Sequence, residues 1–541
     1  MGGIRCPRRR RGRLRRERTG GQGHGHAHGG AAGKARAPVP ARRPGGAENA
    51  VRHSQGAVLT ACSPDIPTRK KTGSTISAMT SQDCCPLDLR PMMGQNRIPD
   101  RVHHIHLVAV CGTAMGALAA MLQEMGYRVT GSDQNVYPPM STFLAARNIV
   151  VRSGFCQDNL ADTPDLVVVG NTVSSDNPEA AAVRRQKLPF CSMPQAINHF
   201  IAAGRKPIVI TGTHGKTTTS ALIAWILESA GLSPSFVIGG IVSDFSGNYR
   251  LGQGPYIVLE GDEYDTAYFD KGPKFLHYPA HVAVLTGVEF DHADIYRDLA
   301  HVQSAFARFV SALAPEAVLL AASGQQSVQA VLGNGRCQIQ RYGQRLEDDW
   351  TVGNVVLAPP WTEFEVRRSR RLHAVFRTKM MGEHNLSNLV AAAAAADAVG
   401  VAPADVAQAL ATFSGVRRRQ EIRGVKSGVT VMDDFAHHPT AVRETIRAVR
   451  PFFPAGRLIA VFEPRTNSSM RSVFQNVYPA CFDGADLVCI RKPPLLSKIP
   501  APERFCSETL VKDLRRRGKD ARYFEETAPI VDFVADTARE G

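Results

Sequence analysis

The sequence of 541 residues lacks any apolar run long enough to cross a bilayer. A membrane-spanning helix needs about 20 consecutive, mostly apolar residues. The basic N-terminus is not followed by an apolar segment, so the pattern of a secretory signal peptide is missing as well. We therefore expect no membrane insertion and a cytoplasmic location.

Cysteine is sparse and irregularly spaced. The eleven cysteines form no C-x-x-C pair and no zinc-site spacing, and only Cys84 and Cys85 are adjacent. A secreted disulfide scaffold or a zinc module would show regular spacing. The pattern predicts reduced thiols in an intracellular protein.

Acidic residues are scarce only near the N-terminus. Residues 1–100 hold 19 of the 65 Lys and Arg but 6 of the 49 Asp and Glu, which is +13 of the net +16. This segment also lacks hydrophobic periodicity, so it is predicted to be a basic, disordered extension. The remaining chain is nearly neutral, and we expect no nucleic-acid partner.

One alternative of another class is an ATP-binding regulator that uses the basic segment to bind nucleic acid. Salt-sensitive DNA binding by the full chain, but not by a chain that starts at Arg101, would favour that alternative.

The length exceeds what one hydrophobic core supports, and three domains are expected. Alternating strand and helix patterns predict α/β domains with doubly wound parallel sheets. We place the boundaries at 101–205, 206–415 and 416–541. A monomer is favoured, although the sequence does not determine the oligomeric state.

The strongest motif is "IVITGTHGKTTTSALIAWILESAG", which starts at Ile208 and ends at Gly231. It predicts a buried strand, a glycine turn and a helix, the arrangement that binds phosphates at a helix N-terminus. Only two residues separate Gly212 from Gly215, fewer than in the common P-loop. Lys216 is expected against the phosphates, and the Thr217 hydroxyl is placed to bind Mg²⁺.

Further polar residues follow the next two strand patterns. Glu260 begins "EGDEYD", and His292 lies within "EFDHAD". Because strand ends line the ligand crevice of an open α/β sheet, Lys216, Glu260 and His292 should converge. Each of them alone could be a surface residue.

The third domain opens with the charge run Arg417–Arg419, which is either solvated or a clamp on a phosphate. Asp433-Asp434 and His437-His438 follow a strand in a predicted strand–loop–helix unit. A metal pair is conceivable there, but adjacent His side chains rarely share one ion. We favour hydrogen-bonding roles.

The first domain has its own glycine turn from Gly112 to Gly116, followed by Asp133 after the second strand. The dinucleotide fingerprint G-x-G-x-x-G is incomplete. Taken alone the signal is weak, and it suits any nucleotide diphosphate, including a UDP-sugar.

These residues together resemble the Mur ligases and the related folylpolyglutamate synthases. The resemblance runs from about Ile105 to at least Val531, and its supporting pieces are "TGTHGKTT", "EGDEYD", "DHAD", "GEHNLSN", "VRRRQE" and "DDFAHHPTA". It implies three domains, namely a Rossmann-like UDP-sugar domain, a central ATPase-like domain and a C-terminal Rossmann-like domain. It also implies ATP and Mg²⁺ as cofactors and amide-bond formation through an acyl phosphate.

Two features narrow the subgroup. About a hundred residues of α/β pattern precede the P-loop, unlike in the folylpolyglutamate synthases. Ligases that act late in the pathway carry a modified lysine after the "DH" motif, whereas no Lys occurs between Lys274 and Lys379 here. The chain is therefore similar to the ligases that act on UDP-N-acetylmuramate itself.

Within that group, "GSDQNVYPPMST", "EYDTAYFDKGPKFLHY" and "FEPRTNS" look like the ligase that joins a recycled tripeptide, L-alanyl-γ-D-glutamyl-meso-diaminopimelate, to the UDP-sugar. The alternative is the ligase that adds L-alanine. The chain stops soon after "VADTARE", so the resemblance also leads us to expect that a final strand of the third domain is missing.

The resemblance assigns roles residue by residue. The expected catalytic residues are Lys216, Glu260, His292 and Arg419, and the metal ligands are Thr217, Glu260 and His292. The expected ATP-binding residues are Gly212, Thr213, His214, Gly215, Lys216, Thr217, Thr218, Asn385, Asn388, Arg419 and Asp434. The UDP-sugar is expected at Gly112, Thr113, Ala114, Met115, Gly116, Asp133 and Thr172, and the tripeptide near His437 and Arg465.

Overall fold

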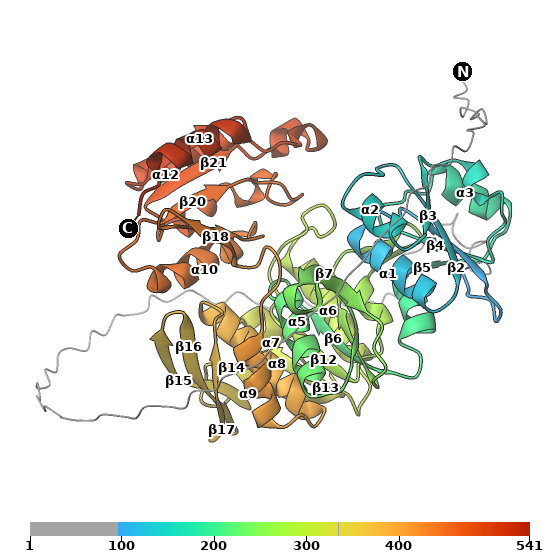
Figure 1. Ribbon diagram of the computed structural model, residues 1–541, viewed down its shortest axis with the longest axis horizontal. Coiled ribbons are helices and arrows are strands. Elements are labelled where there is room, and N and C mark those ends of the chain that lie inside the picture. The colour runs from blue at the N-terminus through green and yellow to red at the C-terminus, as the bar shows by residue number, and fades with distance from the viewer. Residues whose placement is uncertain (1–95, 334, 541) are drawn as a thin grey trace, which may run out of the picture. The chain divides into compact units, whose positions relative to one another are not determined.

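The computed structural model describes residues 96–333 and 335–540 (Figure 1). Most of the predicted N-terminal extension lies outside the described residues. Asn96 pairs with Phe190 and Ile98 packs against the core, so the first unit includes residues before the predicted boundary at 101. Among the described helices, none is long and apolar enough to span a membrane.

The first unit is a five-stranded parallel sheet in the order β3-β2-β1-β4-β5, as its strand and helix pattern predicted. Its strands are β1 (His104–Val108), β2 (Arg128–Asp133), β3 (Val150–Ser153), β4 (Leu166–Val169) and β5 (Phe190–Ser192). Its helices are α1 (Thr113–Glu124), α2 (Met140–Ala145), α3 (Pro178–Arg185) and α4 (Met193–Ala196). The edge strand β3 was not predicted; it is only four residues long and none of them is fully buried.

The second unit contains a ten-stranded sheet in the order β17-β16-β15-β14-β13-β12-β6-β9-β7-β8. The strands from β6 to β9 are β6 (Lys206–Thr211), β7 (Ser235–Val242), β8 (Gly247–Arg250) and β9 (Tyr256–Glu260). Those from β12 onward are β12 (Val282–Leu285), β13 (Val318–Ala322), β14 (Gln338–Gly343), β15 (Trp350–Ala358), β16 (Trp361–Arg368) and β17 (Arg371–Thr378). A small antiparallel pair, β10 (Asp265–Ala267) and β11 (Asp270–Pro273), lies outside this sheet.

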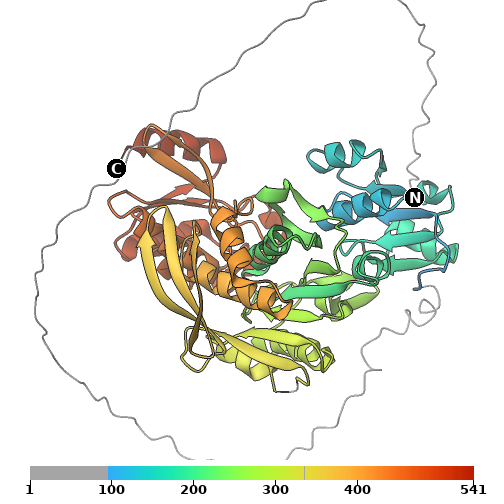
Figure 2. The ribbon, with the colours of Figure 1, turned by 60° about the horizontal axis from the view of Figure 1, so that its bottom comes forward.

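Helices cover both faces of this sheet, because successive side chains of its central strands point to opposite faces and both sets are buried. Ile208 and Ile210 of β6 pack in the cluster that contains α5 (Lys216–Ser229), α8 (Glu383–Ala398) and α9 (Pro403–Thr412), whereas Val209 packs on the other face with α6 (Leu299–Ala312). A strand buried on both sides reads as a continuous apolar run, as "PIVIT" does. The antiparallel strands β15–β17, in yellow, are clearest in Figure 2, and α7 (Gln326–Val331) lies between β13 and β14 in the sequence.

The third unit has a parallel sheet in the order β20-β21-β22, formed by β20 (Ile459–Phe462), β21 (Leu487–Arg491) and β22 (Asp520–Phe524). Val488 and Ile490 of β21 face the cluster with α10 (Pro439–Val449), α11 (Tyr478–Cys481) and α12 (Ser507–Arg516). Leu487 and Cys489 face α13 (Thr527–Thr537). The sheet is therefore covered on both faces, as expected for a Rossmann-like unit.

The start of the third unit differs from the predicted strand–loop–helix. Two strands, β18 (Glu421–Lys426) and β19 (Val429–Asp433), form an antiparallel hairpin before α10. Ser427 and Gly428 connect them with φ of +50° and +74°. Positive φ at both central residues is typical of the tight turn of a hairpin, so the Ser-Gly pair was the signal that the prediction missed.

A buried carboxylate ties together the elements of the first unit. Glu179 of α3 is fully buried and accepts hydrogen bonds from Ser132 Oγ and Asn159 Nδ2, both at 2.5 Å. The Nε2 atom of buried His106 lies 3.4 Å from the same carboxylate. Because a buried carboxylate is tolerated only when its partners are in place, this network fixes α3 against β1 and β2.

We expect Glu179→Ala to destabilise the first unit by about 3 kcal/mol or more, because three buried polar groups lose their shared partner. The measurement is the midpoint of thermal unfolding. The control is Asp162→Ala, which removes an exposed carboxylate that pairs with Arg128 and Arg152 and should cost about 1 kcal/mol or less. Equal effects of the two variants would contradict the role given to Glu179.

Candidate active site

The glycine turn between β6 and α5 has the backbone that a phosphate site requires. Gly212 and Gly215 have φ of +120° and +80°, a region that favours glycine. A Cβ on Gly212 would lie 2.4 Å from Thr286 Oγ1, and one on Gly215 would lie 2.5 Å from Asn388 Oδ1. The turn thus admits only glycine at both positions, and its amides precede a 14-residue helix whose positive end favours an anion.

Lys216 is the first residue of that helix and is almost fully buried. Its Nζ donates to the carbonyl oxygen of Gly212 at 2.7 Å and pairs with Glu263 Oε2 at 2.5 Å. Burial alone lowers the pKa of Lys216, but the nearby carboxylates, Glu263 foremost, raise it overall. Lys216 is therefore protonated at neutral pH, with Glu263 as its ion-pair partner.

Glu263 was not singled out from the sequence, although it lies in the quoted run "EGDEYD". The run indicated carboxylates near the site, but the periodicity did not tell which of them would point inward. Glu263 is buried, and the backbone carbonyl of the same residue accepts a hydrogen bond from Tyr296.

Glu260 meets the turn because β6 and β9 are parallel and Ile210 is in register with Glu260. Thr217 Oγ1 donates to Glu260 Oε1 at 3.0 Å, and the guanidinium of Arg419 donates to the same hydroxyl at 3.3 Å. One hydroxyl and one carboxylate oxygen at this spacing suit a hard oxygen-loving cation such as Mg²⁺. The structure thus brings together Thr217, Glu260 and Arg419.

His292 lies beside Tyr264, which belongs to the same run of residues as Glu260. Its ring centroid is 4.3 Å from that of Tyr264. Burial alone would raise the pKa of Asp262, but Lys274, Lys216 and His292 together lower it, so His292 is close to the carboxylates of the site. No hydrogen bond joins His292 to Glu260 within the described residues, so only two of the three predicted metal ligands are in direct contact.

Asn385 and Asn388 of α8 are buried and link the turn to the third unit. Thr219 Oγ1 donates to Asn388 Oδ1, Asn388 Nδ2 donates to Asn385 Oδ1, and Asn385 Nδ2 donates to Gln420 Oε1. The three distances are 3.2, 3.1 and 3.0 Å. The backbone amide of Gln420 in turn donates to Asp434 at 2.8 Å.

The two residues predicted near the peptide have different surroundings. His437 Nδ1 lies 3.0 Å from the carbonyl oxygen of Phe435, and its Nε2 lies 3.9 Å from Asp291. Arg465 follows β20 and is largely exposed, with Glu463 as its ion-pair partner at 3.4 Å. Arg465 is therefore available to a ligand carboxylate.

The predicted UDP-sugar turn lies at the N-terminus of α1. Asp133 Oδ2 accepts from the amide of Cys111 at 2.8 Å and therefore supports this turn. Asn248 of β8 donates to the carbonyl of Thr113 at 3.4 Å, a contact that the sequence did not indicate. Thr172 is exposed beyond the end of β4.

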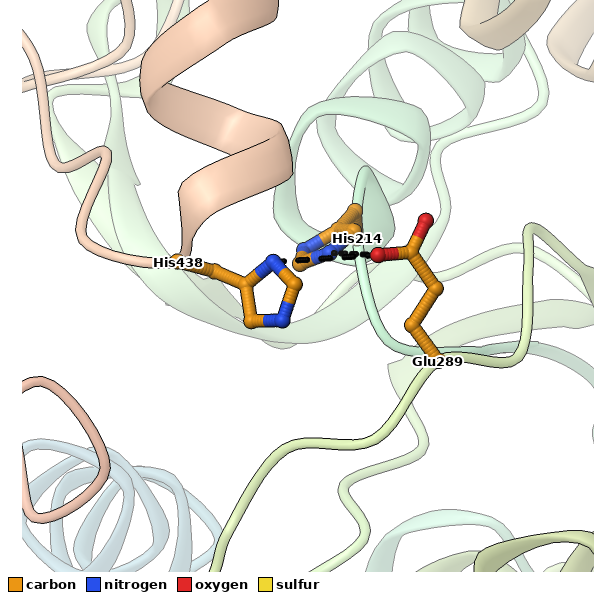
Figure 3. A group of neighbouring side chains, drawn as sticks. All are labelled: His214, Glu289 and His438. Atoms are coloured by element: carbon orange, nitrogen blue, oxygen red, sulfur yellow. Dashed lines mark ion pairs between the residues drawn. The ribbon is translucent and has the colours of Figure 1, made fainter. Parts of the chain in front are cut away.

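A further cluster joins residues that are far apart in the sequence (Figure 3). The side chains of His214, Glu289 and His438 converge so that one potential ligand atom from each lies within 4.8 Å of the others. His437 and His438 point to different partners, as expected for adjacent residues of the chain. The sequence placed His214 in the glycine turn but did not associate Glu289 with it.

Comparison with known proteins covers all three units. The Mur ligase family catalytic domain matches residues 104–205, the Mur ligase middle domain matches residues 210–396, and the Mur ligase glutamate ligase domain matches residues 418–541.

Two curated relatives and one solved structure extend this match. The chain is 37% identical over 438 residues to the UDP-N-acetylmuramate–L-alanyl-gamma-D-glutamyl-meso-2,6-diaminoheptandioate ligase of Escherichia coli (strain K12). The matched region covers 81% of this chain and 93% of the relative. It is 33% identical over 453 residues to the UDP-N-acetylmuramate–L-alanine ligase of Agrobacterium fabrum, with 82% and 93% covered. The crystal structure of a murein peptide ligase from Psychrobacter arcticus matches with a TM-score of 0.62 at 30% identity, over 81% of this chain and 94% of that one. The chain belongs to the Mur ligase family.

Proposed function

We propose that the protein joins L-alanyl-γ-D-glutamyl-meso-diaminopimelate to the muramoyl carboxylate of UDP-N-acetylmuramate, with ATP as the energy source. The observation that carries this proposal is the 37% identity to the relative named for that tripeptide, over 93% of that relative's length. The relative named for L-alanine alone is 33% identical, so addition of L-alanine is the second candidate.

The chemistry requires activation because a carboxylate is a poor electrophile. Transfer of the γ-phosphoryl group to the muramoyl carboxylate gives an acyl phosphate and ADP. The α-amine of the L-alanyl residue then attacks the acyl carbon, and phosphate leaves from the tetrahedral intermediate. The first step brings a carboxylate against a phosphate, and the second develops negative charge on the acyl oxygen, so cationic side chains lower both barriers.

The side chains of this protein supply that charge. Lys216 and the backbone amides of the glycine turn would bind the β- and γ-phosphates; in support of this, Lys216 Nζ lies at the turn and Arg419 reaches the Thr217 hydroxyl from the third unit. Thr217 and Glu260, with His292 nearby, would hold Mg²⁺, which neutralises phosphate charge when bound. Closure of the units over the substrates would exclude water from the acyl phosphate.

The acceptor is tested by phosphate release with ATP, Mg²⁺ and UDP-N-acetylmuramate, with either the tripeptide or L-alanine added. We expect kcat/KM to be higher for the tripeptide by about tenfold or more, since its extra carboxylates can add charge-assisted hydrogen bonds. A preference for free L-alanine would instead support the second candidate.

Lys216→Ala should lower kcat for ligation by about 100-fold or more, because the phosphates lose their buried counter-charge. A matched control is Lys271→Ala, which removes an exposed lysine whose partner is Asp265 at 2.9 Å. The control should keep its turnover. Near-normal turnover of a folded Lys216→Ala protein would rule out the phosphate site proposed here.

Arg465→Ala should raise the KM for the tripeptide by about tenfold or more, which corresponds to one charge-assisted hydrogen bond of roughly 1.5–3 kcal/mol. The KM values for ATP and the UDP-sugar should stay nearly constant. Arg516→Ala serves as the control, because Arg516 is an exposed arginine of the same unit with an acidic partner of its own. A parallel rise of all three KM values would assign Arg465 a structural role.

A further inference from the structure

His214, Glu289 and His438 have the spacing of a metal site. His214 Nε2 lies 3.5 Å from Glu289 Oε2, and His438 Nδ1 lies 3.7 Å from the same oxygen. In a tetrahedral site with metal–ligand bonds of about 2.0–2.1 Å, the ligand atoms lie about 3.4 Å apart. Both distances to Glu289 are thus within a few tenths of an ångström of that spacing, and all three ligand atoms lie within 4.8 Å of one another.

One of the two ring nitrogens that face Glu289 has no hydrogen-bond partner among the described residues. This atom is His214 Nε2, which is buried. His438 Nε2 lies 3.2 Å from the carbonyl oxygen of Phe290, which can only accept, so the ring proton belongs on Nε2. His438 Nδ1 then accepts from the amide of Thr440 at 3.2 Å, and an ion bound at this nitrogen would replace that hydrogen bond.

The surroundings also orient the ligands. Thr440 Oγ1 donates to Glu289 Oε2 at 2.7 Å, and Gln325 Nε2 donates to Glu289 Oε1 at 2.9 Å. The contact from His438 Nε2 to a backbone carbonyl is the usual outer contact of a metal-bound imidazole.

We propose that His214, Glu289 and His438 form a binding site for a transition-metal ion, for which Zn²⁺ is the best match, separate from the Mg²⁺ site at Thr217 and Glu260. Two imidazoles and one carboxylate favour Zn²⁺ over Mg²⁺, which prefers six oxygen ligands. Three protein ligands leave a fourth position for water or a ligand.

The three ligands come from the turn after β6, the loop after β12 and the N-terminus of α10. A bound ion would therefore connect the phosphate-binding turn of the central unit to the third unit. This inference does not depend on which acceptor the enzyme uses.

The test is a titration of the full-length, metal-free chain with Zn²⁺ against a chromophoric chelator, with excess Mg²⁺ present. The sequence "GHGHAHGG" offers further imidazoles, so all proteins carry His24→Asn, His26→Asn and His28→Asn as a common background. We expect the background protein to bind one Zn²⁺. His438→Asn and Glu289→Gln should each weaken binding by about tenfold or more.

His438→Asn is chosen because His438 caps α10, and asparagine is a good N-cap, so the helix is retained. The control is His437→Asn, which removes the neighbouring imidazole and should leave Zn²⁺ affinity unchanged. Co²⁺ provides a second readout, because the visible absorption of tetrahedral Co²⁺ should be present in the background protein and in His437→Asn but lost in His438→Asn.

Absence of Zn²⁺ binding by the background protein would overturn the proposal. Equal Zn²⁺ affinity of the background protein and both ligand variants would do the same, as would an equal loss in His437→Asn and His438→Asn.

Discussion

The register of three parallel strands is the constraint on which the site depends. β9 and β12 both pair with β6, which places Glu260 beside Ile210 and Leu285 beside Thr211. The segments that follow all three strands therefore emerge at one edge of the sheet. A slip of one residue in either pairing would turn Glu260 to the opposite face or displace the loop that carries Glu289.

This constraint explains why much of the site was predictable. The strand–turn–helix around Lys216 has a strong local signal, and the rule that strand ends share one edge brings in Glu260 without any knowledge of its contacts. The resemblance to a known family then supplied roles for Arg419 and Asp434, and the structure shows Arg419 at the Thr217 hydroxyl.

Other features depend on side-chain directions that no local pattern encodes. Glu263 and Asp262 are neighbours in sequence, yet Glu263 pairs with Lys216 and Asp262 pairs with Lys274. Glu289 and His438 lie far apart in sequence, and only tertiary packing brings them together. The hairpin β18–β19 was missed for another reason: its turn signal is local, but β18 is largely exposed and β19 is only partly buried, so neither strand shows a clear apolar pattern.

A chain of hydrogen bonds runs from the Thr219 hydroxyl through the side-chain amides of Asn388 and Asn385 to Gln420, and its direction of donation is fixed. Asn388 and Asn385 each donate toward the third unit and accept from the side of the glycine turn. If either asparagine amide flipped by 180°, its oxygen would face another oxygen, or its nitrogen another nitrogen, and the hydrogen bond would be lost. Loss of ammonia from either side chain during protein ageing would replace a donor with an acceptor and add a buried charge, so slow chemical damage at these two residues would break the hydrogen bonds that join α5 to the third unit.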